Sequence, residues 1–308
     1  MVPCYDELPE LGDTGVRHAW NVWGREDRLG TMNRVSDETV MAALATPQLG
    51  RRVSLSLPLG FFDPPLYGRP PLGHRVFDRN RNMVEDELGP LDPQSSSQWD
   101  GLRHIRAGRF GHYGGIAASD KRAACLGIDV LARLGLVLRG VLLDLPRYWQ
   151  AIGRIVDPHS EYSVVAAELT DCARLQGTSW SEGDLLMVRT GWLEAYRARG
   201  GIPASQLAMP DSAGLDASAS MAKFLWDAGV AAVVSDNPAV EVLPGSPAVG
   251  SLHRRLIPAL GMPLGELWDL DSLAAECADS GHYLMCVVSA PLYVPGAVAS
   301  PANAFAIL

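Results

Sequence analysis

The sequence predicts an α/β protein, and three observations support this fold class. From residue 120 onward, segments with apolar residues at helical spacing alternate with short, almost wholly apolar runs. The chain has 308 residues and is 47% hydrophobic and 20% charged, which is typical of a globular protein with a sizeable core. It contains no run of 18 apolar residues, so a membrane-spanning helix is not expected.

The N-terminal part of the chain differs from the rest. Residues 1–90 are rich in proline, glycine and aromatic residues and contain few periodic runs. A helix is expected after Ser36, whose side chain can cap a first turn that contains acidic residues. The alternating residues 53–59 are typical of a strand, and the prolines and charges of 61–93 predict a long surface loop or arm. We therefore expect an N-terminal arm and loop region packed on one catalytic unit, residues 91–308.

The second part of the chain contains the clearest alternation of elements. The expected helices span 120–138, 164–175 and 217–228, and the expected strands span 140–144, 183–189, 229–235 and 300–308. Functional side chains of α/β proteins collect where strands end. Four charged residues at such ends are therefore candidates for substrate binding: Asp144, Arg147, Arg189 and Asp236.

Charge and cysteine content limit the partners and the compartment. The net charge is −9 and basic residues do not cluster, which argues against nucleic acid or an anionic membrane as the main partner. The N-terminus lacks the basic and apolar segments of a secretory signal. The five cysteines are widely spaced and form no C-x-x-C pair, so neither a zinc knuckle nor a disulfide framework is indicated. A reducing, cytoplasmic compartment is the simplest interpretation.

The segment from Gln94 to His104 predicts an acid–base site. If it is extended, Gln98 and Asp100 leave the same face of the strand and Trp99 leaves the opposite face. His104 can return to the same pocket as a titratable partner of Asp100. A neutral imidazole, a carboxylate and two carboxamides would then converge. The alternative is that Asp100 and His104 only hydrogen-bond to the backbone of a polar turn.

The same segment resembles the signature of the cyclase family, which includes bacterial kynurenine formamidase and isatin hydrolase. Of the signature His-x-Gly-Thr-His-x-Asp-x-Pro-x-His, this chain keeps Asp100 and His104 but has Gln94 and Gln98 in place of the first two histidines. Other matches follow in order along the chain: residues 141–144, 186–192 and 233–238, then Leu252-His253 and Glu266. The resemblance covers about residue 90 to the C-terminus. It implies a swivelling β/β/α fold with a mixed sheet and flanking helices.

The resemblance also implies a metal site. In the family, the first two histidines and the aspartate bind Mn²⁺ or Zn²⁺, the last histidine is a general acid or base, and a downstream His and Glu complete the site. The amide oxygens of Gln94 and Gln98 are weaker donors than imidazole, and catalytic zinc normally has three strong protein ligands. We therefore favour a site without a metal cofactor. The alternative is a Mn²⁺ or Zn²⁺ ion bound by three residues: Asp100, His253 and Glu266.

Without a metal, Asp100 would orient His104 and raise its pKa toward neutrality, so that His104 acts as a general base or acid. Gln94 and Gln98 would donate N–H groups to a substrate carbonyl or developing oxyanion. This arrangement predicts an enzyme that opens lactones or lactams, or that runs cyclisation or dehydration. The alternatives are a Mn²⁺- or Zn²⁺-dependent amidohydrolase and a non-catalytic relative that binds a small ligand. A nucleophilic serine among 95–97 lacks a Gly-x-Ser-x-Gly turn.

Aromatic side chains suggest the kind of substrate. They could wall a pocket for a planar molecule or could pack in the core, and for Trp99 we favour the pocket. The candidate substrate-binding residues are Gln94, Gln98, Trp99, Trp20, Trp23, His112, Tyr113, His253 and Glu266. We expect a small-molecule substrate of aromatic character. The resemblance further implies a homo-oligomer, either a dimer or a tetramer.

Overall fold

The computed structural model describes residues 2–308, and its centre is a nine-stranded mixed sheet. The strand order is β1 (Arg52–Ser54), β13 (Ala304–Ile307), β11 (Leu284–Ser289), β5 (Leu136–Asp144), β7 (Leu185–Arg189), β9 (Ala232–Ser235), β10 (Leu264–Glu266), β4 (Gln98–Asp100) and β12 (Ala299–Pro301). The four strands β5, β7, β9 and β10 run parallel, and antiparallel strands flank them on both sides. The predicted α/β class with a mixed sheet is confirmed.

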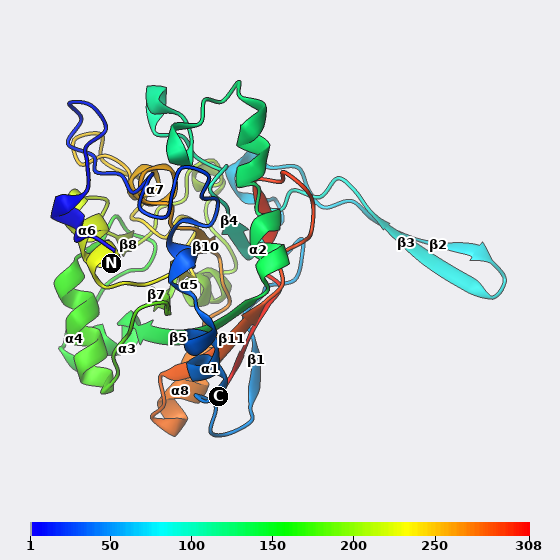
Figure 1. Cartoon of the computed structure of the whole chain (residues 1–308). Helices are drawn as coiled ribbons and strands as arrows, with labels where there is room; N and C mark the ends of the chain where they lie inside the picture. Colours follow the sequence, from blue (N-terminus) through cyan, green and yellow to red (C-terminus); the bar gives the residue numbers. More distant parts are fainter. Residues whose placement is uncertain (1) are drawn as a thin grey trace.

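Helices flank this sheet (Figure 1). They are α1 (Asp37–Leu44), α2 (Asp129–Leu134), α3 (Leu145–Ala151), α4 (Ala166–Gln176), α5 (Trp192–Arg199), α6 (Ala219–Asp227), α7 (Leu252–Arg254) and α8 (Asp271–Ser280). The helix α7 continues directly into a π-helix, η8 (Arg255–Leu260). Short 3-10 helices occupy the loops: η1 (Tyr5–Glu7), η2 (Gly30–Arg34), η3 (Leu66–Gly68), η4 (Gly108–Phe110), η5 (Tyr113–Gly115), η6 (Lys121–Leu126) and η7 (Ala204–Gln206). None of the helices within residues 2–308 has the length and apolar character needed to cross a membrane.

The central strand β5 is buried on both faces, which explains its almost wholly apolar sequence. Val141 and Leu143 belong to one hydrophobic cluster, which the helices α3, α4 and α6 complete. Leu138 and Leu142 point the other way into a second cluster, which contains residues of α8 and β11. The two clusters therefore cover the two faces of the sheet.

The predicted elements match the structure unevenly. Ser36 caps α1, as expected, because its hydroxyl accepts the backbone N–H of Thr39. The continuous helix predicted over 120–138 is wrong. The chain instead forms η6 and α2 and then enters β5, because Gly135 adopts a φ of 69° that ends α2.

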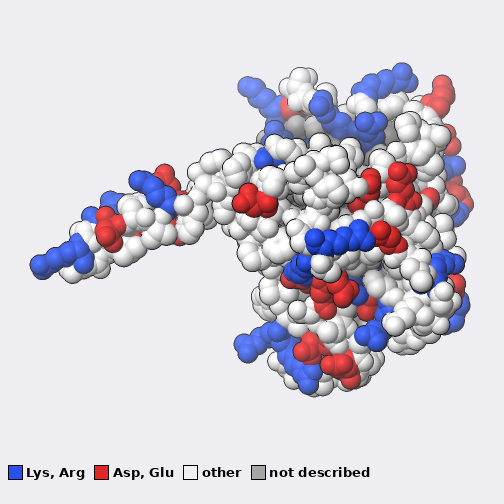
Figure 2. All heavy atoms as spheres, turned by 180° about the vertical axis from the view of Figure 1, so that it is seen from behind, with Lys and Arg blue, Asp and Glu red and all other residues white. Residues whose placement is uncertain are grey.

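The segment predicted as a surface loop or arm contains a regular hairpin. Its strands are β2 (His74–Asn80) and β3 (Met83–Leu88), and the hairpin projects far from the body (Figures 1 and 2). Figure 2 shows charges of both signs along it, and cross-strand ion pairs join the strands: Arg75–Glu87 and Arg79–Glu85. A second, two-residue pairing joins β6 (Ser163–Val164) to β8 (Gly214–Leu215). We call residues 70–93 the arm.

Replacement of Trp99 by alanine is expected to lower the free energy of unfolding by about 3–5 kcal/mol. Trp99 is fully buried, packs edge-to-face on Trp268 and donates its ring N–H to Ser289 at 2.9 Å. Urea denaturation measures the loss. Tyr293→Ala is the control, because Tyr293 is 61% exposed. Equal urea midpoints for the two variants would contradict this packing.

Candidate active site

Antiparallel pairing of β4 with β10 creates the centre of the site. It sets Gln98 opposite Glu266 and Trp99 opposite Gly265. The alternation along β4 is as predicted: Gln98 and Asp100 face the polar cluster and Trp99 packs in the core. Gln98 and Asp100 are both fully buried. A register shift of a single residue would send the side chains of Gln98 and Asp100 into the core. The pairing of β4 with β10 therefore determines that both side chains lie in the site.

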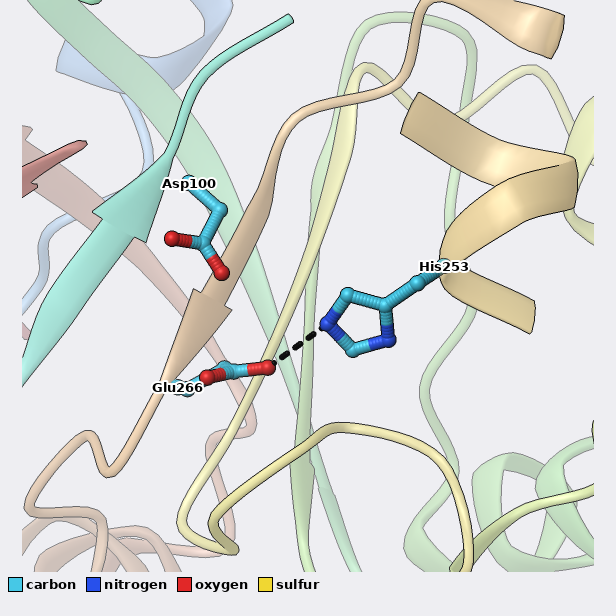
Figure 3. A group of neighbouring side chains, drawn as sticks. All are labelled: Asp100, His253 and Glu266. Carbon is cyan, nitrogen blue, oxygen red and sulfur yellow. Dashed lines mark hydrogen bonds and ion pairs between the residues drawn. The ribbon is translucent and has the colours of Figure 1, made fainter. Parts of the chain in front are cut away.

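His253 lies at the start of α7 and points toward the two strands (Figure 3). Its Nε2 lies 2.8 Å from Glu266 Oε1, and its Nδ1 lies 2.7 Å from Glu241 Oε1. Glu241 also accepts the backbone N–H groups of Leu252 and His253 and the hydroxyl of Ser251. The carboxylate of Glu241 thus caps the helix and fixes the orientation of the imidazole.

Asp100 and His104 come together as the sequence predicts. His104 Nε2 lies 3.7 Å from Asp100 Oδ2, and 23% of the His104 side chain is exposed. Gln94 Nε2 donates to Asp100 Oδ1 at 2.7 Å and lies 3.3 Å from His104 Nδ1. Gln98 Nε2 donates to Glu266 Oε2 at 2.6 Å. The side-chain amides of Gln94 and Gln98 were expected to donate to a substrate carbonyl. In the structure they donate to the carboxylates of Asp100 and Glu266 instead.

Burial dominates the electrostatics of this cluster. Burial, followed by the nearby charge of Glu266, raises the pKa of Asp100 to about 6. Burial lowers the pKa of His104 despite the attraction of Asp100, so the expected rise toward neutrality is wrong in sign. Burial also opposes charge on His253, but hydrogen bonds to Glu241 and Glu266 raise its pKa well above the usual value. The pKa values of the two histidines are thus shifted in opposite directions, downward for His104 and upward for His253.

Three side chains of this cluster fit a divalent metal ion. One ligand atom from each of Asp100, His253 and Glu266 lies within 4.8 Å of the others (Figure 3). Asp100 Oδ2 is buried and has no hydrogen-bond partner within residues 2–308. Glu241 supports the distal nitrogen of His253, which is the carboxylate–histidine arrangement that orients metal ligands. One imidazole and two carboxylates suit Mn²⁺ or Zn²⁺.

The backbone is strained around the same cluster. Four non-glycine residues within 2–308 have a positive φ: Tyr67, Val240, Leu267 and Asn303. Val240 and Leu267 directly precede and follow the two glutamates of the cluster, Glu241 and Glu266. The hydroxyl of Tyr67 donates to the carbonyl of Pro238 at 3.1 Å. Such conformations cost free energy and are concentrated at functional sites.

Sequence reasoning missed three residues of this region, namely Glu241, Tyr67 and Arg69. Glu241 follows the strand-end segment 233–238, but no residue spacing links it to His253. Arg69 Nη1 donates to the backbone carbonyl of Gln94 at 2.5 Å, which joins the N-terminal region to the site. The four prolines and two glycines of residues 64–73 indicated only a loop.

The predicted aromatic wall does not form as one surface. Trp99 faces the core, so the pocket favoured for it is wrong; strand alternation sends its side chain to the opposite face. The other four candidates make contacts elsewhere: Trp20 with the carbonyl of Pro258, Trp23 with the ring of Trp226, His112 with the carbonyl of Ile105, and Tyr113 with Asp27.

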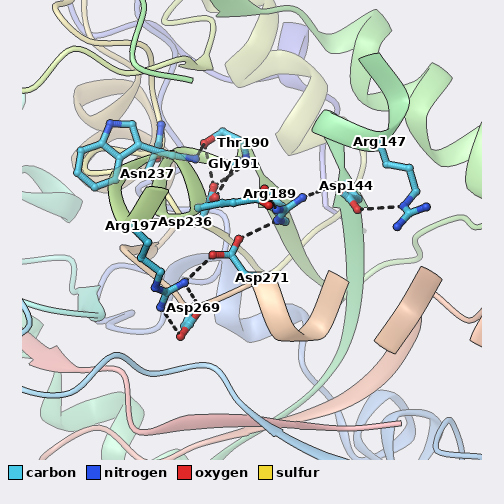
Figure 4. A network of polar contacts seen from close by, with 12 residues as sticks. Asp144, Arg147, Arg189, Thr190, Gly191, Arg197, Asp236, Asn237, Asp269 and Asp271 are labelled. Atoms are coloured by element: carbon cyan, nitrogen blue, oxygen red, sulfur yellow. Dashed lines mark hydrogen bonds and ion pairs between the residues drawn. The ribbon is translucent and has the colours of Figure 1, made fainter. Parts of the chain in front are cut away.

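The strand-end charges predicted as substrate-binding candidates form a separate ion-pair network (Figure 4). Arg189 contacts Asp144 at 2.8 Å and Asp271 at 3.0 Å, and Arg147 lies 3.6 Å from Asp144. Asp236 accepts the N–H groups of residues 190 and 191 and the hydroxyl of Thr190. The ion pairs of Arg189 in β7 link this strand to Asp144 in β5 and to Asp271 in α8. Within the described chain these side chains are therefore paired with one another and stabilise the packing of the sheet.

Comparisons with known proteins agree with this fold and site. A family described as putative cyclases matches residues 53–242, which is more than half of the chain. The chain therefore belongs to the cyclase family, as the resemblance predicted. A comparison with curated proteins finds no match.

Solved structures support the same assignment. A crystal structure described as a novel cyclase is 28% identical, with a TM-score of 0.81, and the match covers 94% of this chain and 99% of that one. An isatin hydrolase bound to the product analogue thioisatinate is 14% identical, with a TM-score of 0.59 and coverage of 89% and 99%. Isatin hydrolase A from Ralstonia solanacearum is also 14% identical, with a TM-score of 0.58 and coverage of 87% and 95%. The two hydrolases show that the fold is shared.

Proposed function

We propose that this protein is an enzyme that opens or closes a lactone, lactam or amide bond in a small molecule, with His104 as the proton-transfer group. The observation that carries this proposal is the pairing of a partly exposed imidazole with a fully buried carboxylate, Asp100. His104 can contact a substrate, whereas Asp100 acts through His104. This pairing supports acid–base catalysis more directly than a role in stability.

The lowered pKa of His104 suits it to act as a base. A neutral imidazole accepts the proton of an attacking water or hydroxyl group and then delivers it to the leaving oxygen or nitrogen. Asp100 stabilises the imidazolium that forms between the two steps. Gln94 hydrogen-bonds to Asp100 and lies against the ring of His104, so it helps to hold the carboxylate and the imidazole next to each other.

We further propose that Asp100, His253 and Glu266 hold one Mn²⁺ or Zn²⁺ ion, which was the less favoured alternative on sequence grounds. The support for this proposal is Glu241, which orients His253 with its Nε2 toward the two carboxylates. When bound, such an ion would polarise the scissile carbonyl and lower the pKa of a bound water. The residues Gln94 and Gln98 then act around the ion site as hydrogen-bonding groups.

A metal-free enzyme is the second candidate. It is favoured by the raised pKa of His253, because Glu241 and Glu266 on either side of the imidazole stabilise its protonated form. A protonated His253 would balance the buried carboxylates without a metal ion. Proton transfer by His104 would then supply the chemistry alone, as in lactone opening or dehydration.

Metal content and turnover measured on the same preparation test both proposals. Elemental mass spectrometry on untagged protein, purified without chelator, is expected to find about one Mn or Zn per chain. Activity is assayed on a panel of aryl lactones, lactams and amides that includes isatin, for which two structural relatives are named. Turnover with no metal, even after soaking in Mn²⁺ and Zn²⁺, would select the metal-free enzyme. Binding of panel compounds without any turnover would select a non-catalytic relative.

A further inference from the structure

Arg69 is a cation next to the proposed active site that the mechanism above does not use. It follows η3 and lies with its guanidinium 4.8 Å over the ring of Tyr67. Its side chain is only 18% exposed. Nη1 donates to the carbonyl of Gln94, and Nε lies 3.9 Å from Asp92 Oδ2, which is too long for a hydrogen bond. Most of its N–H donors therefore have no protein acceptor within residues 2–308.

Gln94 connects this cation to the base. Its backbone carbonyl accepts from Arg69, and its side-chain nitrogen lies 3.3 Å from His104 Nδ1. Arg69 is close enough to contribute to the lowered pKa of His104. A carboxylate that contacts the exposed part of His104 would therefore lie within electrostatic range of the Arg69 guanidinium.

The groups around the Arg69 guanidinium indicate which kind of anion it could bind. A guanidinium presents two parallel N–H groups, which match a planar carboxylate. The acidic cluster of Asp100, Glu241 and Glu266 lies nearby and disfavours a dianion such as phosphate. The ring of Tyr67 lies under the guanidinium and is itself held by a hydrogen bond to Pro238, so it fixes the position of Arg69. Together these features fit a monocarboxylate.

We propose that Arg69 binds the carboxylate that opening of the acyl bond produces, and that ring closure consumes, so that the substrates are precursors of small monocarboxylic acids. This inference rests on the proposed function. In the opening direction, water adds its oxygen to the acyl carbon and the bond to the leaving oxygen or nitrogen breaks. The leaving atom takes one proton, and the new acid releases the other as it ionises. No oxidant or reductant is needed.

The test measures binding, so that it is independent of turnover. Isothermal titration calorimetry compares benzoate with its uncharged analogue benzamide on the protein as purified. Arg69→Met is expected to weaken benzoate binding roughly 10- to 100-fold and to leave benzamide binding unchanged. Arg69→Lys keeps the charge but loses the paired donors, so an intermediate loss is expected. Arg75→Met, on the projecting hairpin, is the matched control and is expected to bind benzoate as the wild type does.

Several outcomes would overturn the inference. They are equal affinity of the wild type for benzoate and benzamide, and unchanged benzoate affinity in Arg69→Met. A loss of benzamide affinity equal to the loss of benzoate affinity would overturn it too, since it would indicate local unfolding. Failure of the proposed function is a separate result, namely Arg69-dependent binding of benzoate in a protein that turns over nothing in the panel. That result would support the carboxylate site at Arg69 and would reject the catalytic role proposed for His104.

Discussion

Replacement of His104 by glutamine is expected to reduce kcat/KM by about 10²–10⁴-fold on any substrate that the wild type turns over. Glutamine keeps a polar side chain of similar reach but cannot accept or deliver a proton at neutral pH. The side chain is partly exposed, so the variant should fold with a thermal midpoint close to that of the wild type. Steady-state kinetics on the lactone and amide panel measures the effect.

The matched control is His74→Gln on the hairpin. His74 is an exposed imidazole that pairs with a carboxylate of the opposite hairpin strand, Asp86, and it contacts no residue of the proposed site by hydrogen bond or ion pair within residues 2–308. It is expected to leave kcat/KM unchanged. If His104→Gln retained full activity while remaining folded, another group would have to transfer the proton and the proposed role of His104 would be lost.

Replacement of His253 by leucine is expected to lower the free energy of unfolding by about 3–5 kcal/mol, and to abolish stoichiometric metal binding. The imidazole is nearly buried between Glu241 and Glu266, so its removal leaves two buried carboxylates without a counter-charge. Urea denaturation of protein treated with chelator isolates the stability effect from the loss of a bound ion. Elemental analysis of untreated protein gives the metal content.

His282→Leu controls for the loss of an imidazole, because His282 is exposed and outside the cluster. Its expected effect on the free energy of unfolding lies within about 0.5 kcal/mol. A His253→Leu protein as stable as the control would mean that the two glutamates are solvated or protonated rather than held by the imidazole. Retention of a full equivalent of metal would exclude His253 as a ligand.

The sequence predicted the parts of the site that depend on local geometry. Gln98 and Asp100 share a face because side chains alternate along any strand, and His104, four residues beyond Asp100, lies 3.7 Å from its carboxylate. His253 and Glu266 came from the family resemblance, and both lie in the cluster. The alternation of helices and strands likewise predicted the central sheet.

Other features depend on long-range packing and could not be predicted. Val240, directly before Glu241, adopts a positive φ, which a β-branched residue avoids unless its surroundings impose it, so the position of Glu241 beside His253 could not be predicted. Arg69 contacts the backbone of Gln94 although residues 70–93, which the sequence predicts as a loop or arm, separate the two residues. The pKa of His104 has the wrong predicted sign because burial of a side chain cannot be read from its neighbours in sequence.

The arm has a geometric consequence for the site. Residues 70–93 leave the body directly after Arg69 and return directly before Gln94, and backbone hydrogen bonds between Gly73 and the pair Gly89 and Pro90 hold the base of the arm closed. The separation between Arg69 and Gln94 is therefore set by the spacing of two paired strands. The pairing at the base of a projecting hairpin thus helps to fix the distance between Arg69 and Gln94, two residues next to the proposed active site.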